Sequence, residues 1–150
     1  MREAATRAHD ERPLPEYATL AGVYGAVLAG FLALARNRLP QRIGFGDLTR
    51  IGLASYKLGR LIAKDDVTAF VRAPVTEGEE SGEEEPKGEG IQRALGELVT
   101  CPYCAGVWVA AGLTYGVVLF PRETRVVTTI FGAQGVADFL NAAFVRLRQT

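Results

Sequence analysis

The chain's only two cysteines lie in the tetrapeptide Cys101-Pro102-Tyr103-Cys104. An apolar run follows, so we expect the pair in the first turn of a helix, where Pro102 fits. A helix N-terminus stabilises a thiolate, which makes Cys101 and Cys104 a candidate redox pair. Two alternatives stay open. The cysteines can be small apolar packing residues. Alternatively, two chains can together hold a metal through four thiolates, because a zinc site needs about four ligands and one chain offers only two cysteines and the distant His9.

Two comparisons of this motif with known thiol proteins fail. Glutaredoxins carry CPYC after a β-strand of a thioredoxin-like fold, whereas here GELVT precedes it and AGVWVAAGLTYG follows. The vitamin K epoxide reductase-like and disulfide-bond-B class carries CxxC at a helix start in a membrane bundle. Those proteins generally use a second cysteine pair, which this chain does not have.

A second candidate site is a polar face inside the last apolar run. Gln134, Asp138 and Asn141 share a spacing that places them on one side of a helix. A carboxylate within a membrane is costly unless it is paired or hydrated. Its candidate partners are Arg50, Lys57 and Arg60, which together with Lys64 make up a basic helix face. Asp138 therefore has three interpretations: it forms a structural ion pair, it lies near the membrane interface, or it is the centre of a proton or ion conduit.

Three apolar runs, residues 17–35, 101–120 and 126–145, must position these groups, and Asp138 is the one charged side chain among them. Each has about the 20 residues that a helix needs to cross a hydrocarbon core of about 30 Å. We predict an all-α fold: a small polytopic membrane helix bundle with transmembrane helices at about 17–35, 91–120 and 124–146. In the second of these, 91–100 is an amphipathic segment that leads directly into the membrane helix headed by the cysteines. Residues 1–16 are expected to be flexible, and 17–150 to form a single membrane domain. A signal peptide is the alternative for the first run, but mixed charges precede it and it exceeds a typical signal core.

Residues 48–63 predict a different kind of helix, with apolar side chains on one side and the basic face on the other. At 1.5 Å per residue it is about 24 Å long, which is short for a membrane crossing. It is expected either to lie at the interface, with its cations among lipid headgroups, or to form a short fourth span with its cations inside the bundle.

The segment 73–90, APVTEGEESGEEEPKGEG, is rich in repelling carboxylates and poor in apolar side chains. This composition predicts a disordered acidic loop. Lysines and arginines are concentrated in the middle loop and at the C-terminus, which the positive-inside rule assigns to the cytoplasm. We therefore expect a multi-pass protein of the bacterial cytoplasmic membrane. The net charge of zero does not indicate a nucleic-acid partner.

Two longer stretches resemble a known family. LGELVTCPYCAGVWVAAGL, at 95–113, is similar to the GELLTCPxCxGxW-like signature of the bacterial membrane proteins grouped as domain-of-unknown-function family 1360. LASYKLGRLIAKDDVTAFVRAPV, at 53–75, resembles their second signature, ATxRLxRLLTxDxVTxPLRAPF. The resemblance covers residues from about 47 to the C-terminus. It implies an integral membrane protein and transfers no catalytic residue, because the family has no established activity.

Our leading functional hypothesis is a structural or protein-interaction module, without enzymatic activity, cofactor or metal. Its expected partners are the lipid bilayer and other membrane proteins or further copies of itself. Small residues at helical spacing, such as Gly22, Ala26 and Gly30, favour close helix packing. The alternatives are a membrane thiol-disulfide oxidoreductase using the CPYC pair and a small conduit around Asp138.

Overall fold

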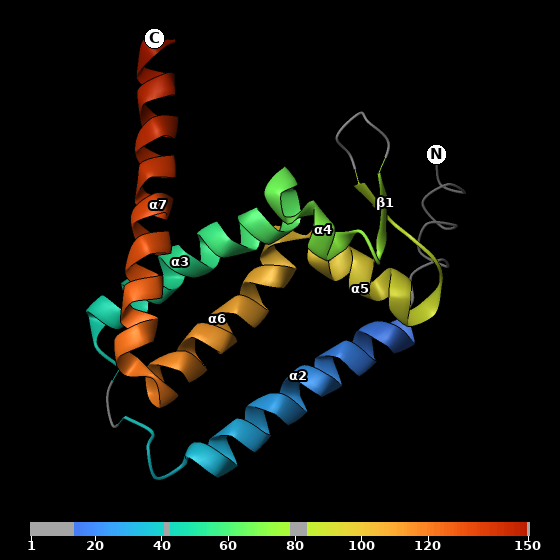
Figure 1. Ribbon diagram of the computed structural model, residues 1–150, viewed down its shortest axis with the longest axis horizontal. Helices are drawn as coiled ribbons and strands as arrows, with labels where there is room; N and C mark the ends of the chain where they lie inside the picture. The colour runs from blue at the N-terminus through green and yellow to red at the C-terminus, as the bar shows by residue number, and fades with distance from the viewer. Residues whose placement is uncertain (1–13, 41–42, 79–83, 150) are drawn as a thin grey trace.

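The computed structural model describes residues 14–40, 43–78 and 84–149, and these form a helical bundle (Figure 1), which confirms the all-α prediction. Of the segment 1–16 that was expected to be flexible, residues 1–13 lie outside the described residues. Residues 14–16 form the start of the first described helix. In chain order the elements are α2 Leu14–Ala35, α3 Phe45–Lys64, the 3-10 turn η1 Asp66–Thr68, α4 Ala69–Arg72, β1 Thr76–Gly78, β2 Glu84–Pro86, α5 Gly90–Thr100, α6 Pro102–Leu119 and α7 Pro121–Arg148.

Helix α3 lies at the centre of the fold and packs along both α6 and α7 (Figure 1). Its close contacts rest on glycines. A Cβ on Gly59 would come within 2.7 Å of the Pro102 carbonyl oxygen and 3.2 Å of Gly106 Cα. A Cβ on Gly135 of α7 would lie 3.0 Å from the carbonyl oxygen of Leu53. These contacts let the helix backbones approach closely, as small residues do between membrane helices.

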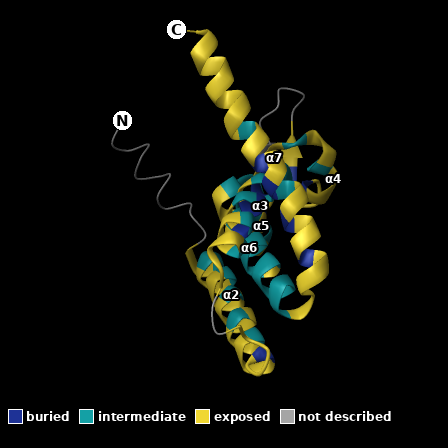
Figure 2. Cartoon of the chain, turned by 90° about the vertical axis from the view of Figure 1, so that its left-hand side faces the viewer, coloured by how far each residue is buried: buried dark blue, intermediate teal, exposed yellow. Residues whose placement is uncertain are grey.

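Small side chains fill the interior, and many large apolar ones lie outside. Ala54 and Ala94 are fully buried, whereas Phe139, Leu140 and Phe144 of α7 are more than half exposed. Figure 2 shows the C-terminal part of α7 extending away from the other helices with its surface exposed. This distribution is the reverse of that in a water-soluble domain, where large apolar side chains dominate the core.

Helix α2 contacts the bundle along one stripe. Tyr24 meets Trp108 of α6 edge to face with ring centroids 5.1 Å apart, and Phe31 stacks on Tyr115 at 4.0 Å. Most of the helix is otherwise exposed.

Within the described residues, α2 and α6 are long and apolar enough to cross a membrane. Only 6% of each apolar stretch is buried, so neither resembles the core helix of a soluble protein. Helix α7 is long enough, but its mean hydropathy is too low to meet the same criterion. Gln134, Asp138 and Asn141 lower it by interrupting the apolar run. The prediction of three transmembrane helices is therefore not confirmed.

Two local predictions were wrong. The expected helix 91–120 is two helices, because Cys101 adopts an extended conformation (φ −95°, ψ 110°) between α5 and α6. A residue before proline is disfavoured in the helical region, and Pro102 imposes that break.

The second correction concerns the acidic loop 73–90, whose described residues are not disordered. Strands β1 and β2 pair antiparallel, with Thr76 opposite Pro86. The pair packs on α5: a Cβ on Gly96 would lie 2.5 Å from the Val75 carbonyl oxygen, and Gln92 Nε2 donates to the Pro74 carbonyl at 3.1 Å. Backbone pairing and packing thus order the ends of the segment. Its middle, 79–83, lies outside the described residues.

Candidate functional site

The CPYC motif forms the turn between α5 and α6. Cys101 is the N-cap of α6, and its Sγ accepts a hydrogen bond of 3.3 Å from the Cys104 backbone N–H. Pro102 begins the helix, where the absence of an N–H costs nothing. Both thiols are free, with Cys101 half-buried and Cys104 exposed. The sequence had placed both cysteines in this first turn.

The environment of Cys101 favours its thiolate. Burial opposes ionisation of the thiol, but hydrogen bonds from Cys104 and from the Tyr103 backbone outweigh it, with a contribution from the Lys64 charge. The pKa of Cys101 therefore lies below its ordinary value. Gly59 allows this arrangement, because a larger residue there would collide with Pro102 and push the turn away from α3.

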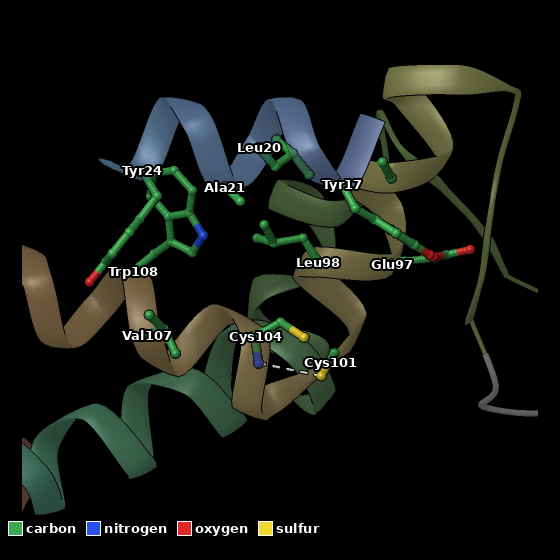
Figure 3. A pocket seen from close by; sticks show the side chains of 11 residues that line it. Tyr17, Leu20, Ala21, Tyr24, Glu97, Leu98, Cys101, Cys104, Val107 and Trp108 are labelled. Carbon is green, nitrogen blue, oxygen red and sulfur yellow. Dashed lines mark hydrogen bonds between the residues drawn. The ribbon is translucent and has the colours of Figure 1, made fainter. Parts of the chain in front are cut away.

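The cysteines border a cavity of about 550 Å³ between α2, α5 and α6. Figure 3 shows the two sulfur atoms at one end of this space and Trp108 with Tyr24 at the other. Leu20, Leu98 and Val107 supply apolar wall, and the carboxylate of Glu97 lies at the margin, where it also accepts from Arg93 Nε at 3.3 Å. The arrangement places a thiol with a lowered pKa beside an apolar cavity.

A second, polar pocket of about 300 Å³ lies between α3 and α7. In its lining, Lys57 Nζ donates to Asp138 Oδ2 at 2.9 Å. Arg60, Asp65 and Asn141 line the same space. Of the cations that the sequence offered as partners of Asp138, the structure brings Lys57 to the carboxylate.

The remaining predicted residues are dispersed. Arg50 pairs with Asp47 within α3 at 2.5 Å, Lys64 lies near Cys101, and Gln134 is exposed on α7. Of the basic face, Lys57 and Arg60 border the polar pocket, whereas Arg50 and Lys64 lie near other groups. Among the described residues, no group of three His, Cys, Asp or Glu side chains could hold a metal ion.

Sequence reasoning missed Arg72, whose side chain is buried at 2% exposure. Its Nη1 donates to the carbonyl oxygens of Ile62 at 2.6 Å and Asp65 at 3.1 Å, and to Thr68 Oγ1 at 3.1 Å. The guanidinium thus caps the C-terminal end of α3, where helix carbonyls need partners. The signal was available, because Arg72 lies inside the stretch 53–75 that resembles a family signature. Trp108 and Glu97, which border the larger cavity, were also missed.

Comparison with known proteins agrees with those two stretches. A family model described as "Protein of unknown function (DUF1360)" matches residues 51–144. The UPF0713 protein YngL of Bacillus subtilis (strain 168) is 29% identical over 114 residues, covering 71% of this chain and 87% of that protein. The sporulation protein YjcA of the same organism is 26% identical over 98 residues, covering 60% of this chain and 83% of its own length. No solved structure matches.

Proposed function

This chain belongs to the DUF1360 family, whose description assigns no function, and we propose that it is an integral membrane helix bundle serving as a structural or protein-interaction module. The observation that carries the proposal is an interior made mostly of alanines, glycines and threonines beneath an exterior of large apolar side chains. In water, exposing that exterior would cost a free energy of about 25 cal/mol per Å² of apolar surface. A bilayer removes that cost, because lipid chains solvate the same side chains.

In this proposal α2, α6 and α7 cross the membrane. Helix α7 has 28 residues, or about 42 Å at 1.5 Å per residue, which exceeds the hydrocarbon core. Its carboxylate at Asp138 is the main obstacle to insertion, and Lys57 neutralises it. The position of α3 between α6 and α7 supports the alternative in which its cations point into the bundle, rather than the one in which it lies flat on lipid.

Membrane fractionation tests this proposal. The chain should remain with the membrane after carbonate extraction at high pH, and release into the soluble fraction would contradict it. For sidedness, we expect the β1–β2 hairpin and the C-terminus in the cytoplasm of a bacterial cell. In a Cys101→Ser, Cys104→Ser background, Glu85→Cys should be protected from an impermeant maleimide in intact cells and labelled after lysis. Labelling without lysis would reverse the orientation.

A second candidate function is thiol-disulfide exchange at the CPYC turn. The observation that favours it is the position of both sulfur atoms, free and beside an apolar cavity, with Cys101 at a helix N-terminus. Packing cysteines are usually buried and inert, whereas Cys104 is exposed.

Thiol counting tests this candidate. The reduced protein, treated with glutathione disulfide in a redox buffer, should lose two titratable thiols together and regain them with dithiothreitol. Cys104→Ser should instead stop at a mixed disulfide with glutathione on Cys101. If the wild-type pair did not react, the thiol-exchange function would be excluded and only the structural role of the cysteines would remain.

A further inference from the structure

The larger cavity is built by three helical stripes that converge. The lining comprises Tyr17, Leu20, Ala21 and Tyr24 from α2, Ala94, Glu97 and Leu98 from α5, and Cys104, Val107 and Trp108 from α6. Each stripe follows the i, i+3, i+4 spacing of a single helix face. The volume of about 550 Å³ lies within the range of about 300–1,000 Å³ typical of small-molecule sites.

The chemistry of the wall indicates an apolar, flat ligand with a hydrogen-bond acceptor. Figure 3 shows the indole nitrogen of Trp108 pointing into the space near Leu98, while the hydroxyl of Tyr24 points away from the thiols. The Trp108 N–H can therefore donate to a ligand oxygen. Aliphatic and aromatic side chains on the remaining walls favour a ring over a charged or strongly hydrated molecule.

The position of the cavity indicates where the ligand comes from. It lies between α2 and α6, the two described helices that are long and apolar enough to cross a membrane. A ligand that enters between them must dissolve in lipid. A ligand in this space also meets two thiols at one end. Cys101 and Cys104 lie in one helical turn, where the Cys104 backbone N–H donates to Cys101 Sγ at 3.3 Å.

We propose that this cavity binds a lipid-soluble quinone, which oxidises the Cys101–Cys104 dithiol to a disulfide. The inference rests on the second candidate function and names its electron acceptor. In the step, both S–H bonds break and one S–S bond forms. The two electrons and two protons pass to the quinone, whose two carbonyl oxygens become the hydroxyls of a hydroquinone. The hydroquinone then leaves through the membrane.

Trp108 provides a direct binding assay, because it is the only tryptophan in the chain. With the reduced protein in nanodiscs, decylubiquinone should quench its fluorescence in a saturable manner, since a bound quinone accepts an electron from the excited indole. Ala21→Phe, which places a ring in the cavity, should abolish the saturable component. Ala26→Phe on the same helix, away from the cavity, is the matched control and should retain it. Quenching that ignores Ala21→Phe would overturn the site.

The redox step is tested separately by counting thiols and hydroquinone. The wild type should lose two thiols for each quinone reduced, and Cys101→Ser with Cys104→Ser should bind the quinone without reducing it. Saturable binding without thiol loss in the wild type would overturn the electron transfer. A pair that reacts with glutathione disulfide but not with the quinone would overturn this inference alone. A pair inert to both would remove the thiol-exchange function as well.

Discussion

The guanidinium of Arg72 donates a hydrogen bond of 2.6 Å to the carbonyl oxygen of Ile62, in the last turn of α3. The same Nη1 reaches Asp65 and Thr68, so one buried cation joins the end of α3 to the short turn η1 and to α4. The Thr68 hydroxyl also donates to the Asp65 carbonyl at 2.9 Å. This network explains why the stretch KDDVTAFVRAPV departs from a helical apolar pattern: its polar residues terminate a helix.

We predict that Arg72→Lys destabilises the protein by about 1.5–3 kcal/mol, the range for hydrogen bonds to a charged group. Lysine keeps the charge but loses the planar fork of donors that reaches several acceptors. Thermal unfolding in mild detergent measures the effect. The control is Arg122→Lys at an exposed position on α7. Equal melting temperatures for the two variants would show that the cap contributes nothing.

The close approach of α3 and α6 gives a second prediction. Gly59→Ala should cost about 1–3 kcal/mol, as overpacking does, because the new methyl group meets the Pro102 carbonyl. Gly52→Ala on the same helix is the matched control, since nothing lies within 4 Å of its Cβ position. Gly59→Ala should also change the alkylation rate of Cys101, because the CPYC turn must shift. A tolerated Gly59→Ala with an unchanged rate would refute this contact.

The sequence predicted where helices form better than where they end. The uncharged run 17–35 lies within α2, and the amphipathic segment 48–63 lies within α3, because apolar periodicity dictates both. Pro102 indicated a first helical turn, but the apolar positions of 91–100 were joined to the run that follows, so the break at Cys101 was missed. The hairpin was missed for another reason. Residues 76–78 and 84–86 pair through their backbones. Glutamate is the commonest residue among them, so the sequence lacks the alternation of apolar and polar residues that predicts a strand.

The candidate sites were predictable only in part. Helical spacing placed Arg50, Lys57 and Arg60 on one face but could not choose among them. The choice depends on where α3 crosses α7, which Gly135 sets through its contact with Leu53. The cavity beside the cysteines depends on three helices that are distant in sequence, so no local pattern could indicate it.

The position of Cys101 at a helix N-terminus gives a prediction about pH. Because the pKa of Cys101 lies below its ordinary value, its thiolate should persist at lower pH than that of an unperturbed cysteine. In Cys104→Ser, which retains a hydroxyl donor and the backbone N–H, the iodoacetamide rate should reach half its maximum at a lower pH than in an unstructured reference peptide with one cysteine. Lys64→Met should move that midpoint to higher pH.

Lys87→Met serves as the control for this profile, since the contact of Lys87 is with Glu77 in the hairpin. It should leave the midpoint unchanged. A Cys101 profile that coincides with a free thiol, or a Lys64→Met profile that overlays its parent, would contradict the electrostatic account.

The last prediction concerns the pair that joins α3 to α7. Asp138→Asn removes the carboxylate charge and leaves Lys57 unpaired near the bundle interior. Exposed pairs contribute up to about 1 kcal/mol, and breaking a buried one costs about 3–5 kcal/mol. The side chains of Lys57 and Asp138 are 20% and 38% exposed, so the loss should fall between these values.

The matching cation change should rescue this loss at one position only. Lys57→Met should restore much of the stability of Asp138→Asn, whereas Arg50→Leu and Arg60→Leu should not. A double-mutant cycle over Lys57 and Asp138 measures the coupling directly. If Asp138→Asn kept its melting temperature but altered proton or ion flux in proteoliposomes, the pair would not be structural. The polar pocket bordered by Arg60, Asp65 and Asn141 would then become the candidate conduit.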